Sequence, residues 1–154
     1  MVKDQHRKGG FIKMNVTEKY DLMMFNTKIG EFQIDDTVVP RQFRIVMLEK
    51  FIGDFRLEIL NVRQKDGIVD DKGVREFIKS RVVPRNRVSI DKLLKRIGLS
   101  EYDPYLIFKY NRGSCGKDDT WVKFNDEDKF QDFHPRRFYY DKSKENVEPV
   151  IFNN

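Results

Sequence analysis

The stretch YDLMMFNTKIGEFQI, residues 20–34, decides the class of fold. It holds an apolar run at 20–25 and a second run at 29–34 in which apolar and polar residues alternate. Two such runs around a short polar turn that contains Gly30 predict an antiparallel β-hairpin. Pro40 follows the hairpin and ends the second strand, because proline has no N–H to donate to a sheet.

Further strands are expected on the C-terminal side of the hairpin. Residues 43–62 fit both a strand and a helix by their apolar spacing, and we expect strands at about 43–49 and 55–62. The sequence QKDG at 64–67 is a turn signal. The run TWVKF at 120–124 predicts a strand late in the chain.

The first predicted helix begins after Asp70 or Asp71, either of which can cap it. Its apolar residues recur at intervals of three and four, which is the spacing of one helix face, at Val74, Phe77 and Ile78. It should end near Val83, because the residue before a proline is disfavoured in helical conformation.

A second helix is expected from about Asn86 to Gly98, where the glycine closes it. Its apolar stripe consists of Ile90, Leu93, Leu94 and Ile97. Ser100 or Asp103 then caps a third, short helix, whose first turn suits Pro104 and whose end lies at Gly113.

These elements predict an α+β fold: a small antiparallel sheet, built from the N-terminal hairpin plus later strands, packed against two or three helices. We expect a single domain at 14–140, in which the aromatic stretch 130–140 forms a packed irregular arm. Residues 1–13 read MVKDQHRKGGFIK and predict a disordered leader, and we expect natural translation to start at Met14. Residues 141–154 predict a C-terminal tail.

Composition limits the class of protein. The 154 residues include 30 Lys and Arg against 25 Asp and Glu, a formal net charge of +5. Residues 1–13 contain four of these cations and one anion, so +3 belongs to the leader and +2 to the rest. No apolar run approaches the roughly 20 residues of a membrane-spanning helix. A single Cys excludes a disulfide framework, and the sequence predicts a cytoplasmic protein with no cofactor, no metal and no membrane partner.

The glycine-rich sequence GSCGK at 113–117 only partly resembles a phosphate-binding loop. Asn111 stands where that loop needs its first glycine, and Asp118 stands where a Ser or Thr would hold Mg²⁺. We therefore interpret the segment as a turn between a helix and a strand.

Catalytic alternatives are weak but remain open. Cys115 with His134 or His6 has the residue types of a nucleophile and its base, but catalysis needs the two within hydrogen-bond reach. Three acidic pairs have residue types that bind a divalent ion but lie beside turns and caps, where Asp has a structural role; they are Asp35-Asp36, Asp70-Asp71 and Asp118-Asp119. A small enzyme that uses Cys115 or an acidic pair is the least favoured hypothesis.

The strongest candidate for a binding site is basic. Cations crowd the two-helix segment around Pro84, at Lys79, Arg81, Arg85, Arg87, Lys92, Lys95 and Arg96. A second patch combines Arg136 and Arg137 with the aromatic residue Tyr139 and its neighbours. Arg and Tyr are enriched at protein interfaces, and aromatic side chains also stack on nucleic-acid bases. The alternative is that the first group forms the solvated faces of two amphipathic helices.

The run FIKSRVVPRNRVSIDKLLKRIGLSEYDPYLIF at 77–108, followed by DDTWVKF at 118–124, resembles small bacterial proteins related to the N-terminal region of HipA-type kinase toxins. The resemblance extends over about 20–132. Its shared features are Arg81, Pro84, Arg87, Leu94, Gly98, Leu99, Tyr102, Asp103, Asp119 and Trp121.

HipA-type kinases carry their ATP site and catalytic base in a long C-terminal body, and no kinase catalytic-loop pattern occurs here. The resemblance therefore implies a protein partner rather than kinase activity. We expect a non-catalytic protein-binding regulator, either in a toxin–antitoxin-like system or as a phage or mobile-element inhibitor of a host defence complex, similar to an anti-CRISPR protein. The alternative is a nucleic-acid-binding module that uses the cations of the two-helix segment.

Overall fold

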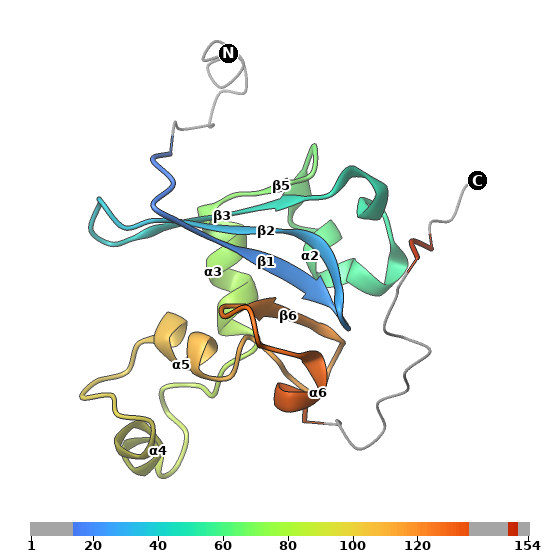
Figure 1. Ribbon diagram of the computed structural model, residues 1–154. Coiled ribbons are helices and arrows are strands. Elements are labelled where there is room, and N and C mark those ends of the chain that lie inside the picture. The colour runs from blue at the N-terminus through green and yellow to red at the C-terminus, as the bar shows by residue number, and fades with distance from the viewer. Residues whose placement is uncertain (1–13, 136–147, 151–154) are drawn as a thin grey trace.

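The computed structural model describes residues 14–135 and 148–150, and the predicted leader at 1–13 lies outside these residues. Six strands form one sheet in the order β4-β5-β3-β2-β1-β6, and every neighbouring pair is antiparallel (Figure 1). The strands are β1 Glu18–Met24, β2 Thr27–Asp35, β3 Gln42–Met47, β4 Gln64–Lys65, β5 Ile68–Val69 and β6 Thr120–Lys123. With the helices packed against this sheet, the predicted α+β class is confirmed.

All helical elements in the described residues follow β3 in the chain. They are η1 Glu49–Phe51, η2 Phe55–Leu57, α2 Glu58–Asn61, α3 Asp71–Lys79, α4 Ile90–Arg96, α5 Pro104–Tyr110 and α6 Phe130–Phe133. In Figure 1, α3 lies behind the strands, whereas α4 stands away from the sheet at one end of the molecule. The contacts of α3 with β3, β5 and α5 place it on one face of the sheet.

The N-terminal hairpin pairs β1 with β2 as predicted, but its turn is at Phe25 and Asn26 and not at Gly30. Gly30 lies inside β2, opposite Leu22 on β1 and Met47 on β3. A Cβ at this position would lie 2.8 Å from the carbonyl oxygen of Val46. The glycine therefore permits the close approach of β3 rather than the reversal of the chain.

Two predicted helix caps are confirmed. The side chain of Asp70 accepts a hydrogen bond from the N–H of Gly73 at 2.9 Å and so begins α3. Asp103 accepts from the N–H of Tyr105 at 3.0 Å, and Pro104 occupies the first turn of α5. Both carboxylates satisfy N–H groups that have no partner within the helix.

The predicted strand at 55–62 is wrong, because this stretch is helical. A strand would have placed Phe55, Leu57 and Ile59 on one face, but Phe55 is 51% exposed. The fully buried residues are Leu57 and Leu60, which are three positions apart, as on a helix. The side chain of Asp54 begins the first turn by accepting the N–H of Arg56 at 3.0 Å.

Other boundaries also differ from the predictions. α3 ends at Lys79, four residues before Val83, and α4 begins at Ile90 rather than near Asn86. Between them the chain makes separate turns, in which Arg87 N–H donates to the Pro84 carbonyl at 3.1 Å. The expected irregular arm contains a short helix, α6, and its residues from 136 onward lie outside the described part of the chain.

The core is rich in aromatic rings, and Phe32 on β2 lies at their centre. Its ring stacks on two rings of α5, with centroid distances of 5.7 Å to Phe108 and 6.4 Å to Tyr105. It also contacts Phe43 on β3, at 5.8 Å, and Phe124 after β6, at 6.4 Å. One side chain thus joins the sheet to α5, and each such ring pair adds to the stabilisation that burial itself provides.

Part of the C-terminal segment contacts the η2 region. The carboxylate of Asp54, which is fully buried, accepts the N–H of Val150 at 2.9 Å and is paired with Arg56 at 2.7 Å. Arg56 in turn donates to the carbonyl of Glu148 at 2.7 Å. Burial raises the pKa of Asp54, but the hydrogen bonds from Arg56 and Val150 outweigh it, and the net pKa lies below its usual range.

Among the residues that the structure describes, no helix has the length and apolar character needed to cross a lipid bilayer.

Replacement of Phe32 tests the central place of this ring. We expect Phe32→Ala to lower the free energy of unfolding by about 3–5 kcal/mol, because it removes a large buried side chain and leaves a cavity. Urea denaturation measures the change. Val62→Ala serves as a control, since Val62 is 69% exposed and its truncation should change stability by less than about 0.5 kcal/mol. A similar small effect for Phe32→Ala would contradict the assignment.

Candidate functional site

Arg81, one of the predicted binding residues, points into the protein and is only 5% exposed. Its guanidinium donates to both carboxylate oxygens of Asp118, at 2.9 and 2.7 Å. It also donates to the backbone carbonyls of Gly113 and Thr120, the latter at 2.6 Å. Because its hydrogen-bonding groups are used inside the protein, Arg81 is a structural residue, and its assignment to a partner surface is wrong.

The carboxylate of Asp118 is held in the same network. Burial raises the pKa of Asp118. The hydrogen bonds and positive charge of Arg81, together with the hydrogen bond from the Thr120 N–H, lower it by more than burial raises it, so that the pKa lies below its usual range. The carbonyl of Asp118 lies 2.8 Å from Nε2 of His134, which is itself buried. The aspartate that interrupts the phosphate-loop pattern is therefore the partner of Arg81.

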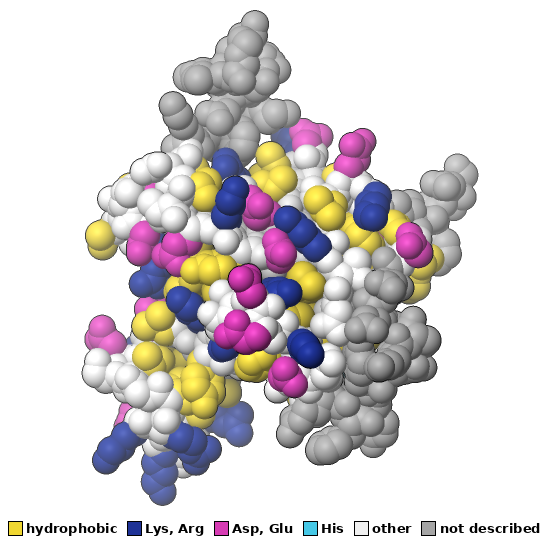
Figure 2. Space-filling model, viewed as in Figure 1, with side chains coloured by type: hydrophobic (Ala, Val, Ile, Leu, Met, Phe, Trp, Pro, Cys, Tyr) yellow, Lys and Arg dark blue, Asp and Glu magenta, His cyan; other side chains and the backbone are white. Residues whose placement is uncertain are grey.

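The other predicted cations of the two-helix segment face solvent. We define the basic lobe as residues 82–103, which run from the end of α3, through α4, to the start of α5. All five of its cations are exposed, and among the described residues none of them forms an ion pair. They are Arg85, Arg87, Lys92, Lys95 and Arg96. Figure 2 shows Lys and Arg side chains gathered at the end of the molecule where α4 stands in Figure 1.

The basic lobe also exposes apolar surface. Of the predicted stripe on α4, only Leu94 is buried, and it lies outside the main core cluster. The remaining members of the stripe, Ile90, Leu93 and Ile97, are half-buried. Val88, just before the helix, is 87% exposed. Apolar groups next to unpaired cations are a combination found at protein interfaces.

Tyr102 fixes the lobe to the end of α3. Its hydroxyl donates to the carbonyl of Val83 at 2.6 Å, and burial raises its pKa. The guanidinium of Arg85 lies over the Tyr102 ring, with its central carbon 4.8 Å from the ring centroid. This contact holds Arg85 close to the body while leaving its charge exposed.

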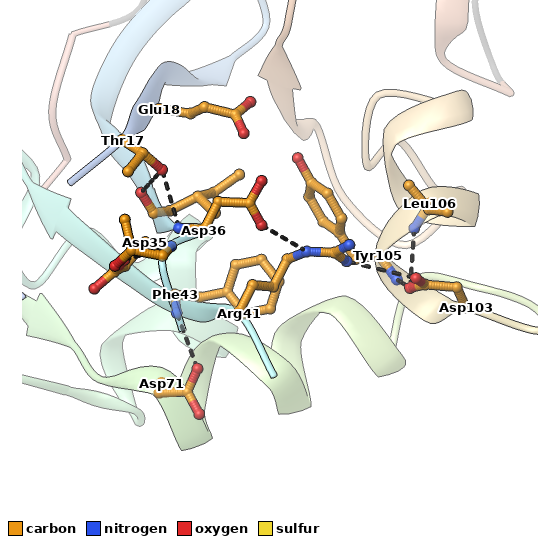
Figure 3. Close-up of polar contacts among 12 residues, drawn as sticks. Thr17, Glu18, Asp35, Asp36, Arg41, Phe43, Asp71, Asp103, Tyr105 and Leu106 are labelled. Carbon is orange, nitrogen blue, oxygen red and sulfur yellow. Dashed lines mark hydrogen bonds and ion pairs between the residues drawn. The ribbon is translucent and has the colours of Figure 1, made fainter. Parts of the chain in front are cut away.

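A groove of about 790 Å³ lies beside these residues, between α3, the Pro84 corner, the start of β3 and the start of α5. Its walls combine cations, aromatic rings and aliphatic side chains. It is lined by Arg41, Phe43, Arg75, Ile78, Lys79, Ser80, Val82, Pro84, Arg85, Tyr102, Asp103, Pro104, Tyr105 and Lys117. Figure 3 shows Arg41 and the Tyr105 ring side by side, with Asp103 next to them at the start of α5.

Two of the five cations in the groove are neutralised within the protein. Arg41 lies between Asp36, at 3.6 Å, and Asp103, at 3.5 Å, and stacks over the Tyr105 ring at 4.9 Å (Figure 3). Arg75 pairs with Asp71 at 2.8 Å. These pairs order the wall of the groove but leave little net charge on it.

The other three cations of the groove keep their charge. Lys79 and Arg85 form no ion pair among the described residues. The ammonium of Lys117 makes a weak contact with the Ser80 carbonyl at 3.5 Å, which places it at the C-terminal end of α3. The groove therefore carries an unbalanced positive charge on the side of the basic lobe.

The sequence predicted part of this site. Lys79 and Arg85 were recognised from the local density of cations. Arg41 and Lys117 were missed, because they approach the groove from distant parts of the chain. Arg41 has no neighbouring motif, and Lys117 lies in the GSCGK sequence, which we interpreted only as a turn. The predicted patch at Arg136, Arg137 and Tyr139 lies outside the described residues.

The catalytic candidates show no assembled site in the described part of the chain. Cys115 is half-buried, and Nε2 of His134 lies 2.8 Å from the carbonyl oxygen of Asp118 and 3.6 Å from a carboxylate oxygen of Asp119. His6 lies outside the described residues. No group of three or more His, Cys, Asp or Glu side chains that could hold a metal occurs in the residues 14–135 and 148–150.

Comparisons with protein-family models, with curated proteins and with solved structures found no match. The resemblance to the N-terminal region of HipA-type kinases therefore stays a prediction.

Replacement of Arg81 separates its structural role from a binding role. We expect Arg81→Met to lower the free energy of unfolding by about 3 kcal/mol or more, because it leaves the Asp118 carboxylate without its charged partner. Arg87→Met is the matched control, since Arg87 is exposed and forms no ion pair within the described part of the chain, and should change stability by less than about 0.5 kcal/mol. Equal effects of the two replacements in urea denaturation would show that Arg81 is not the anchor described above.

The lowered pKa of Asp118 predicts a pH dependence. A carboxyl group whose pKa is lower in the folded state stabilises the protein above its unfolded pKa, about 3.9, and this contribution is lost as pH falls toward the folded value. We expect Asp118→Asn to reduce stability at pH 7 and to make the loss of stability between pH 5 and pH 3 shallower. The exposed residue Asp126 supplies the control, Asp126→Asn. Parallel pH profiles of the wild type and Asp118→Asn would contradict this expectation.

Proposed function

We propose that this chain is a cytoplasmic, non-catalytic protein-binding regulator that contacts its partner through the basic lobe. One observation carries the proposal. Residues 82–103 hold five exposed cations that form no ion pair with the residues that the structure describes, together with apolar side chains that the core does not cover. A charged surface of this kind steers an acidic partner, and the apolar groups add affinity when they are buried.

The non-catalytic part of the proposal is supported by the contacts of the candidate catalytic residues. The buried ring of His134 contacts the Asp118 carbonyl and lies 4.5 Å, centroid to centroid, from the ring of Phe130. The acidic residues also have structural partners: Asp70 caps α3, Asp71 accepts the N–H of Phe43 on β3, and Asp118 pairs with Arg81. Each of these groups is explained by the fold without a reaction.

The biological setting that we propose follows from the resemblance alone. A chain that resembles the N-terminal region of HipA-type kinases is suited to restrain a toxin kinase in a toxin–antitoxin-like system. The same basic surface is equally suited to a phage or mobile-element inhibitor of a host defence complex, in the manner of an anti-CRISPR protein. In both settings the partner is a protein, and the surface offered to it is the basic lobe.

Nucleic-acid binding is the alternative function, and the same five cations favour it. The two functions differ in their response to salt. Binding to nucleic acid weakens steeply as salt rises, in proportion to the number of phosphates contacted. Protein binding that combines charge with apolar burial weakens less.

Charge reversal on α4 tests the proposal. We expect the wild-type protein to capture a stoichiometric partner from lysate of its native host, and Lys92→Glu/Lys95→Glu/Arg96→Glu to lose at least about 90% of it, since like charges at the interface repel. The matched control is Lys65→Glu/Lys72→Glu/Lys129→Glu, which reverses three exposed lysines elsewhere and should retain the partner. Mass spectrometry of the eluate measures both.

Three outcomes would contradict protein binding through the lobe. These are the absence of a stoichiometric partner, equal capture by the α4 variant and the wild type, and recovery of nucleic acid that is released by moderate salt. Circular dichroism of each variant establishes that the fold is retained.

A further inference from the structure

The groove beside the basic lobe combines a charged rim with an apolar wall. Ile78 and Val82, from α3 and the segment that follows it, form aliphatic surface, and Tyr102 and Tyr105 supply aromatic rings. Lys79, Arg85 and Lys117 hold the unbalanced charge. The volume of about 790 Å³ lies within the range of roughly 300–1,000 Å³ that is typical of ligand-binding pockets.

We infer that this groove binds an extended acidic peptide segment of the partner protein, with a carboxylate held between Lys79, Arg85 and Lys117 and an apolar side chain against Val82 and Tyr102. The inference rests on the proposed protein-binding function and names the partner chemistry for one part of its surface. It follows from charge complementarity, because these three cations face the groove and no described acidic side chain neutralises them.

The groove is organised before any partner arrives. The hydrogen bond from Tyr102 to Val83 fixes the position of the Tyr102 ring, and this ring in turn supports Arg85. On the opposite side, Arg41 is held by Asp36 and Asp103. A side chain that is already held in place loses less conformational entropy on binding, so each hydrogen bond that it makes contributes more to affinity.

A peptide suits this groove better than a nucleic acid does. Arg41 is already paired with Asp103, which also lines the groove, and Arg75 is paired with Asp71, so that three cations of the groove are left for a ligand. Three cations around one hollow match one or two carboxylates, whereas a nucleic-acid strand presents a phosphate at every nucleotide and needs a continuous row of cations. The aliphatic side chains in the groove match leucine or phenylalanine next to those carboxylates.

An array of fluorescein-labelled eight-residue peptides tests the inference on the full chain. One set alternates aspartate or glutamate with leucine or phenylalanine, and a second set carries asparagine or glutamine in place of the acids. We expect the acidic set to bind and the amide set not to bind. Amide NMR shifts on titration should then concentrate at Ser80, Val82 and Tyr102.

Two double variants locate the binding. Lys79→Gln/Arg85→Gln removes two cations of the groove and should weaken the acidic peptides at least about tenfold, the effect of losing one charge-assisted hydrogen bond. Lys72→Gln/Arg87→Gln removes two exposed cations that do not line the groove and should weaken them less than about threefold, because distant charges are screened. Equal denaturation midpoints for the two variants establish that folding is unaffected.

The inference is overturned if no acidic peptide binds at millimolar concentration, if the NMR shifts map to α4, or if the two double variants weaken binding equally. It is also overturned if a thymidine oligonucleotide, and not the peptides, shifts the groove residues. Capture of the native partner separates this inference from the proposed function. If the partner is retained by Lys79→Gln/Arg85→Gln but lost by the α4 triple variant, protein binding stands and the groove is not its site.

Discussion

The buried guanidinium of Arg81 is the interaction on which the rest of the structure depends. Arg81 follows the last residue of α3 by two positions. Its guanidinium donates hydrogen bonds to Asp118, just before β6, to the carbonyl of Thr120, the first residue of β6, and to the carbonyl of Gly113. The end of the principal helix is thereby joined to the strand that closes one edge of the sheet. A lysine would not replace it, because a single ammonium group lacks the fixed planar set of donors that serves one carboxylate and two carbonyls at once.

This anchor also determines where the basic lobe begins. Arg81 is directed inward and Val82 packs against the core, and the turns that follow carry Arg85 and Arg87 out to solvent. Tyr102 then brings the returning chain back to Val83, so that a short hydrogen bond closes the base of the lobe. The groove lies beside this base. The same contacts between α3, the turn at Pro84 and the start of α5 therefore position both the lobe and the groove.

The parts of the fold that depend on local chemistry were predictable from the sequence. The hairpin, the caps at Asp70 and Asp103, and β6 each have a signal within a few residues. The stretch 55–62 was assigned to the wrong class, because its helical form depends on a cap at Asp54 and on burial of Leu57 and Leu60 beneath the rest of the chain. In the same way, composition does not distinguish the inward Arg81 from its outward neighbours, since the partner that holds it is 37 residues away. The groove was only half predicted for the same reason: Arg41 and Lys117 reach it through tertiary structure.

The position of β6 has a consequence for biosynthesis. β1 leaves the ribosome well before β6, Thr120–Lys123, which is its outer neighbour in the sheet. Until that late segment has emerged, one edge of β1 offers unpaired backbone groups to other nascent chains, and such edges promote aggregation. Pairing between strands as distant in sequence as β1 and β6 also slows folding, because the long loop between them must close before the two strands can make contact. The outer edge of β1 thus becomes protected only after β6 has been synthesised, when Arg81 can also meet Asp118.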